Sequence, residues 1–147
     1  MSKKKKIKVE DNERLKWEDL ADTSLALRQS LGEINASIMK LSENLKDVID
    51  SNPDVQQVYN GVVKSLEDLV NKWVELKKLH STEKDGKYYY WMGELDINND
   101  KMVDHYMNLS LAYGGLTNEV VTLANTSIAA LAAEIEKHMD TGEKDGE

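Results

Sequence analysis

Apolar residues between positions 12 and 51 recur at alternating steps of three and four. They are Trp17, Leu20, Leu27, Leu31, Ile34, Ile38, Leu41, Leu45 and Val48, with Ser24 in the one polar gap. This spacing is typical of a helix that packs along a seam. It predicts a first helix over residues 12–51, about 60 Å long at about 1.5 Å per residue. A shorter helix with a kink near Gly32 is the alternative.

A second apolar pattern follows a proline. The segment Ser51-Asn52-Pro53 ends the first helix, because proline disfavours helical geometry in the residue before it and can itself open a helix. The pattern then resumes at Val55, Tyr59, Val62, Leu66, Leu69, Trp73, Leu76 and His80. A second helix over residues 53–80 is therefore predicted, antiparallel to the first because the connection is short. Since the first helix would be longer than the second, part of its apolar face would remain uncovered and available to a partner.

The helical period breaks over residues 81–98. This segment contains Asp85-Gly86, a turn pair, followed by the four aromatic residues Tyr88, Tyr89, Tyr90 and Trp91. Two interpretations are open. Residues 87–95 form a short strand or hairpin arm, or they form a loop whose aromatic side chains cover the end of the helices.

A third helix is predicted from Asn99-Asp100, a helix-capping pair, to about Met139. Its apolar residues are Met102, Tyr106, Leu109, Tyr113, Leu116, Val120, Leu123, Ala124, Ile128, Leu131 and Ile135. Gly114-Gly115 lies in the middle, where two glycines cost about 1 kcal/mol each relative to alanine. We expect either a kink or split there, or the close approach of another helix.

These elements predict an all-α fold, an antiparallel three- or four-helix bundle made of a coiled-coil-like helical hairpin and a third long helix. The helical domain covers residues 12–139, between a flexible arm over 1–11 and an acidic, disordered tail over 140–147. The chain has 147 residues, no phenylalanine and one proline, which favours helices over sheets. It also has no cysteine, which excludes disulfides, thiolate nucleophiles and cysteine-held metals.

Charge separates the N-terminal arm from the rest of the chain. Five lysines, Lys3, Lys4, Lys5, Lys6 and Lys8, outnumber two acids and give residues 1–11 a formal charge of +3. The remaining residues carry −11, because the whole chain has a net charge of −8. The arm is a candidate contact for nucleic acid or another anion, or for an anionic membrane surface, or it is a solubilising end. We expect no membrane span and a cytoplasmic protein, or one within a virion assembled there.

Candidate chemistry in the sequence is sparse. The run from Asp96 to Asp100 resembles the start of a calcium loop, but Lys101 stands where glycine is needed and Met107 where glutamate is needed. A helix-capping loop is the better interpretation. His80, His105 and His138 lie far apart, and the Glu134–His138 pair is typical of a solvated helix face. We predict no catalytic residues, no metal site and no cofactor.

The aromatic run favours contact with protein. Four consecutive aromatic residues cannot all face inward, so one or two should be exposed, and Trp17 marks a second apolar contact. The partner-binding candidates are Trp17, Tyr88, Tyr89, Tyr90 and Trp91. The sequence therefore predicts a non-enzymatic helical interaction or assembly protein, self-associating or docking on other helices as an accessory component of a larger assembly, viral or phage particles included. The alternative is a nucleic-acid accessory factor that uses the lysine arm.

Overall fold

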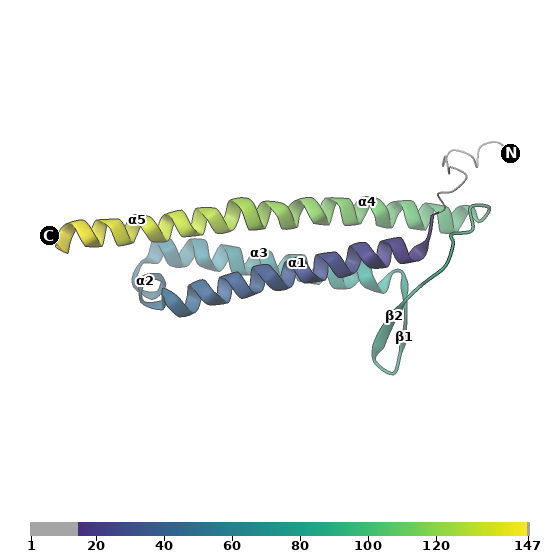
Figure 1. Cartoon of the computed structure of the whole chain (residues 1–147), viewed down its shortest axis with the longest axis horizontal. Coiled ribbons are helices and arrows are strands. Elements are labelled where there is room, and N and C mark those ends of the chain that lie inside the picture. The colour runs from purple at the N-terminus through teal and green to yellow at the C-terminus, as the bar shows by residue number, and fades with distance from the viewer. Residues whose placement is uncertain (1–14, 147) are drawn as a thin grey trace. The chain divides into compact units, whose positions relative to one another are not determined.

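A computed structural model describes residues 15–146 of the chain, with side chains as far as Met139. The described part is mostly helical and contains one two-stranded sheet, which confirms the predicted helical character (Figure 1). The elements are α1 (Trp17–Asn44), α2 (Lys46–Ser51), α3 (Pro53–Lys78), β1 (Ser81–Lys84), β2 (Lys87–Tyr90), α4 (Asp100–Thr122), the π-helix η2 (Leu123–Ser127) and α5 (Ile128–Gly146).

The chain forms two compact units. Unit 1 comprises Met1–Arg28 and Lys72–Leu116, and unit 2 comprises Gln29–Asn71 and Thr117–Glu147. The division falls inside α1, α3 and α4, so each of these helices contributes residues to both units.

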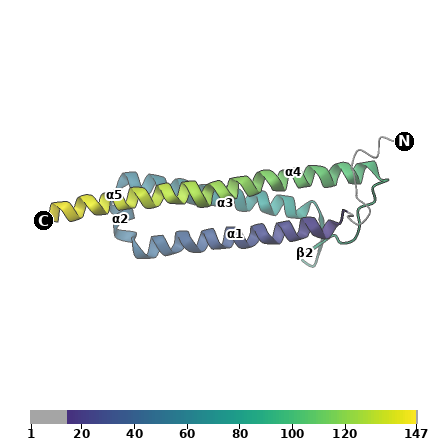
Figure 2. The same ribbon diagram turned by 45° about the horizontal axis from the view of Figure 1, so that its top comes forward.

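Unit 1 joins the start of α1, the end of α3, the hairpin and the first part of α4. The hairpin lies close to the first turns of α1 (Figure 2). The buried side chains of unit 1 are Trp17, Leu20, Ala21, Ser24, Leu27, His80, Leu95, Tyr106, Leu109, Tyr113 and Leu116. Aromatic and polar groups are thus part of this core, together with aliphatic ones.

The hairpin confirms the first interpretation of residues 81–98. Strands β1 and β2 pair antiparallel, with Ser81 opposite Tyr90 and Lys84 opposite Lys87. The turn between them has positive φ angles at Asp85 and Gly86, 54° and 79°, as a type I′ turn requires. The Asp-Gly pair therefore sets the turn, and the pairing places Tyr88 and Tyr90 on the partly buried face of β2.

Helix α1 begins later than predicted. Leu15 and Lys16 are extended and lie against residues 93–95, where Leu95 N–H donates to Leu15 O at 2.8 Å and Trp17 N–H donates to Gly93 O at 2.8 Å. These bonds hold the chain out of a helix until Trp17. Residues 12–14 of the predicted helix lie outside the described part.

Unit 2 has an aliphatic core. Its buried residues are Leu31, Ile34, Ile38, Ile49, Val55, Val62, Leu66, Leu69, Val120, Leu123, Leu131 and Ile135. They come from the end of α1, α2, the first part of α3, the end of α4, η2 and α5, and α2 contacts α5. Among the described side chains of this unit, no polar one is classed as buried.

The reversal at Asn52 is confirmed, but the first helix also breaks earlier. Asn52 is extended, with φ −119° and ψ 109°, and α3 starts at Pro53. Leu45, with φ −123° and ψ 29°, separates α1 from α2, whereas Gly32 lies within α1. With 28 residues in α1 and 26 in α3, the predicted length mismatch is wrong, so it gives no reason to expect a partner.

The third helix continues through Gly114-Gly115 without a break, so the predicted split is wrong. The predicted close approach is also wrong, since a Cβ added at either glycine would meet no atom within 4 Å. The irregularity lies further on, at η2, where Ile128 N–H donates to Leu123 O five residues back. Helix α5 then continues to Gly146, beyond the predicted end at Met139.

The π-helix changes the phase of the apolar pattern. Before it, buried positions step by three and four through Leu116, Val120 and Leu123. The same steps would continue to 127, 130 and 134, but the buried residues after η2 are Leu131 and Ile135, one residue later than 130 and 134. A π-turn accommodates one additional residue, so η2 keeps the apolar face of α5 turned toward the core of unit 2.

Candidate interaction site

Trp17, a predicted partner-binding residue, lies in an aromatic cluster within unit 1. It is 7% exposed and makes edge-on contacts with Trp91 and Tyr106, at ring-centroid distances of 5.0 and 5.2 Å. Tyr106 donates its hydroxyl hydrogen to Lys16 O at 3.2 Å. The cluster ties the first turn of α1 to α4 and the segment after β2. Trp17 therefore presents little surface, and its role in binding stays a prediction.

The three tyrosines of β2 point in different directions, as expected for a strand. Tyr89 is 53% exposed, whereas Tyr88 is half-buried with the Lys77 ammonium 5.3 Å from its ring. Tyr90 shares a 2.7 Å hydrogen bond with the Ser24 hydroxyl. Trp91, next along the chain, donates from Nε1 to Thr82 Oγ1 at 3.2 Å. Of the predicted partner-binding residues, Tyr89 is the one with an exposed side chain.

A buried polar cluster joins α1, α3, β2 and α4 inside unit 1. Trp73 Nε1 donates to Ser24 O and lies 3.0 Å from Ser24 Oγ. His80 stacks on Tyr90, and its Nε2 shares a 2.7 Å hydrogen bond with the Tyr113 hydroxyl. Ser24 and His80 are 0% exposed, so the cluster is closed to substrate and specifies how the helices pack.

Burial sets the protonation states of this cluster. It lowers the pKa of His80 from 6.5 to about 4, with a smaller contribution from His105, and it raises the pKa of Tyr113 to about 12. Both side chains are therefore neutral at pH 7. His80 Nδ1 has no hydrogen-bond partner, which adds to the cost of this site in free energy.

The other predicted contact, the lysine arm, lies outside the described residues. Lys3, Lys4, Lys5, Lys6 and Lys8 precede Leu15, where the description begins.

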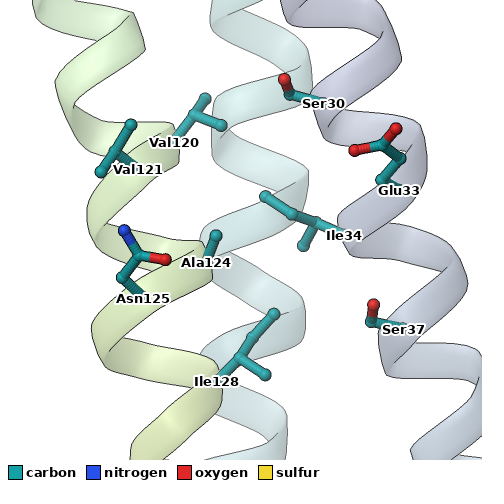
Figure 3. Close-up of a pocket in the computed structure, with 9 residues that line it drawn as sticks. All are labelled: Ser30, Glu33, Ile34, Ser37, Val120, Val121, Ala124, Asn125 and Ile128. Carbon is teal, nitrogen blue, oxygen red and sulfur yellow. The ribbon is translucent and has the colours of Figure 1, made fainter.

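A groove opens on the surface of unit 2 between α1 and the helix that runs from the end of α4 into α5. One wall is a single face of α1, at spacings of three and four residues, and the other follows η2. The lining residues are Ser30, Glu33, Ile34, Ser37, Val120, Val121, Ala124, Asn125 and Ile128, around a volume of about 330 Å³. Figure 3 shows Ile34 and Ile128 extending into the space between the two helices.

The groove has an apolar floor and a polar edge. Ile34 and Val120 are buried at its base, and Val121 remains 49% exposed. Glu33 supplies a carboxylate at the α1 edge, and Asn125 supplies an amide from the π-helix. Single-turn π-helices are rare and occur often at functional sites. The groove and the π-helix are therefore two independent indications of a functional site at the same position.

Sequence reasoning did not find either of these sites. The polar cluster depends on residues distant along the chain, although Ser24 in a series of apolar positions was a visible signal. The groove had a signal too: the predicted apolar pattern steps by a single residue from Leu123 to Ala124, at the point where η2 begins. The prediction that Asn99 caps the third helix is confirmed, because Asn99 Oδ1 accepts a hydrogen bond from the Met102 N–H at the start of α4.

Comparison of the chain with protein-family models, with curated proteins and with solved structures finds no match. Within the described residues, no helix combines the length and the apolar character that a membrane crossing requires.

Proposed function

We propose that the protein is a non-enzymatic interaction module that binds a helix of another protein in the groove of unit 2. The observation that carries the proposal is the groove itself, with its apolar floor between two helices. An amphipathic helix inserts apolar side chains at three- and four-residue spacing into such a groove. The lining residues of α1 follow the same spacing, since Ser30, Ile34 and Ser37 lie on one face.

Charge favours a basic partner helix. Unit 2 contains 5 basic and 14 acidic residues, a formal charge of −9, whereas unit 1 contains 14 basic and 13 acidic residues, a formal charge of +1. Two copies of unit 2 facing each other would repel. A partner helix with apolar residues on one face and lysine or arginine on its flanks would be attracted to unit 2 and oriented by Glu33.

Small side chains in the groove support the docking of a helix. Ser37 and Ala124 line opposite walls, which lets a helix backbone approach closely. The docked helix would pack beside α1 and α5, in an arrangement of the four-helix type. The groove also has the volume of a small-molecule site at the lower end of roughly 300–1,000 Å³, but its open form suits a helix better.

The proposal is tested by filling the groove with a large side chain. In Ala124→Trp the indole would occupy the space intended for the partner, and Ala133→Trp, on an exposed position of α5 outside the groove, is the matched control. Each protein is used to capture partners from cells that produce it naturally, with quantitative mass spectrometry and circular dichroism to verify folding. We expect a partner with a basic amphipathic helix to be retained by the wild type and the control and lost by Ala124→Trp.

The same experiment can contradict the proposal. Equal capture by all three proteins would mean that the groove does not bind the partner. Light scattering over a concentration series tests for self-association. If the wild type forms a dimer and Ala124→Trp does not, the groove binds a second copy of this chain and not a helix of another protein.

A second candidate is contact with nucleic acid, favoured by the five lysines between residues 3 and 8. The acidic charge of unit 2 would repel a polynucleotide, so the arm would have to supply the affinity. Deletion of residues 2–8 should abolish binding to single- or double-stranded DNA or RNA, and the salt dependence of wild-type binding should match the few lysines engaged. Binding that survives the deletion would contradict this candidate.

A further inference from the structure

Three potential metal ligands meet in unit 2, away from the groove. Asp54 is the second residue of α3, and Glu134 and His138 lie one turn apart on α5. One ligand atom from each of the three lies within 4.8 Å of the other two. The sequence shows the Glu134–His138 pair but not the third member, because 80 residues separate Asp54 from Glu134.

The distance between Glu134 and His138 is unusual for a hydrogen bond. His138 Nε2 lies 3.4 Å from Glu134 Oε2, beyond the usual 2.7–3.2 Å. The Nε2 atom is shielded from solvent and has no hydrogen-bond partner. A buried ring nitrogen in this position has lost its bond to water and gained at most a long ion-pair contact with the Glu134 carboxylate in return.

The same distance suits two ligands of one metal ion. Zinc binds histidine nitrogen and carboxylate oxygen at about 2.0–2.2 Å in tetrahedral geometry, which places neighbouring ligand atoms roughly 3.4 Å apart. Glu134 Oε2 and His138 Nε2 have this separation. Asp54 is exposed, so its side chain is free of packing that would prevent it from closing on the same ion.

We propose that Asp54, Glu134 and His138 form a binding site for a divalent transition metal, zinc being the best fit. An imidazole nitrogen favours zinc over magnesium and calcium, which prefer shells of oxygen ligands. Two carboxylates balance the charge of the ion, and water takes the fourth position. The ion fastens the start of α3 to α5, so it stabilises unit 2. The site is independent of the helix-binding groove.

The test is a zinc titration of the full-length protein after removal of metals with a chelator. We expect one zinc ion per chain by isothermal titration calorimetry, with a dissociation constant in the micromolar range or below, and a rise in Tm with zinc concentration. His138→Ala and Glu134→Gln should each weaken binding at least tenfold, and Asp54→Asn should weaken it by a smaller factor. Cobalt should give the intense visible absorption of a tetrahedral site.

His105→Ala is the matched control, since it removes a histidine from unit 1 and should leave the zinc affinity unchanged. All the substituted residues are at least partly exposed, and circular dichroism verifies that each variant folds. Three results would overturn the proposal: no binding below millimolar zinc, equal binding by His138→Ala and the wild type, or loss of binding in His105→Ala.

Discussion

Units 1 and 2 are built on the same apolar spacing but have different cores. In unit 1 a serine, a histidine, tyrosines and a tryptophan share hydrogen bonds and ring contacts among the aliphatic residues. In unit 2 the buried residues are leucine, isoleucine and valine. Acidic residues outnumber basic ones nearly three to one in unit 2, whereas in unit 1 the two kinds are balanced.

The difference shows two ways of specifying how helices pack. Aliphatic packing gives most of the stability but tolerates rearrangement, as long as volume and pattern are kept. A buried hydrogen-bonded cluster allows few alternatives, because each displaced group loses its partner. We therefore expect unit 2 to respond most to lost volume, and unit 1 to lost hydrogen bonds and to pH.

The largest effect is expected from Leu131→Ala in unit 2. Leu131 is 0% exposed, and removing a fully buried leucine side chain costs about 2–5 kcal/mol of unfolding free energy. Urea denaturation followed by circular dichroism measures it. The exposed Met39 of the same unit provides the control: Met39→Ala should change stability by about 0.5 kcal/mol or less. Similar losses in both variants would show that Leu131 is not closely packed in the core of unit 2.

The next effect is acid destabilisation through His80. Its folded pKa of about 4 lies below the ordinary 6.5, so the neutral form is favoured in the folded state. The contribution is complete above pH 6.5 and is lost as the pH falls toward 4, by about 2 kcal/mol between pH 7.5 and 5. Urea denaturation across that range should show the loss in the wild type and a much flatter profile in His80→Gln. Parallel profiles would contradict the assignment.

A smaller loss is expected from Tyr113→Phe. The substitution keeps the ring but removes the hydroxyl that shares a 2.7 Å bond with His80 Nε2, leaving both His80 nitrogens without a partner. The expected cost is roughly 1–2 kcal/mol. Tyr89→Phe is the matched control, because that hydroxyl lies on an exposed side chain, and should be nearly neutral. If chemical denaturation ranks the two variants equally, the cluster does not specify the packing of unit 1.

The smallest effects come from glycines and have opposite signs. Gly86→Ala places a Cβ at φ 79° in the hairpin turn and should cost about 1 kcal/mol. Gly114→Ala lies within a regular helix, where a Cβ meets nothing within 4 Å, and should stabilise the protein by about 0.5–1 kcal/mol. Thermal denaturation should therefore shift Tm in opposite directions. A lower Tm for Gly114→Ala would indicate that Gly114 is needed for a contact with a partner.

The sequence predicted what local chemistry decides. Asn52-Pro53 ended a helix, Asp85-Gly86 formed a turn, and Asn99 capped α4. The errors arose where a tertiary contact competed with local preference. Pairing with residues 93–95 delayed the start of α1, and the break at Leu45 has no glycine or proline next to it.

The sites were harder to predict than the elements. Ser24, Tyr90 and His80 come from three different elements, so their meeting depends on the fold as a whole. The same holds for Asp54, Glu134 and His138. The two adjacent glycines, Gly114 and Gly115, led to the prediction of an irregularity at their position. The irregularity lies at η2, where the spacing of the apolar residues shifts by one.

The π-helix has a consequence for how the length of this chain can vary. Deleting one residue between Leu123 and Ser127 would remove the additional residue and restore an ordinary α-helix, with the residues after it still facing the same way. If η2 became α-helical without a deletion, everything after it would instead rotate by about 100°, Leu131 and Ile135 would leave the core, and Glu134 and His138 would turn away from Asp54. A homologue with an uninterrupted helix should therefore show a single-residue gap at η2, together with apolar residues moved one position toward the N-terminus throughout α5.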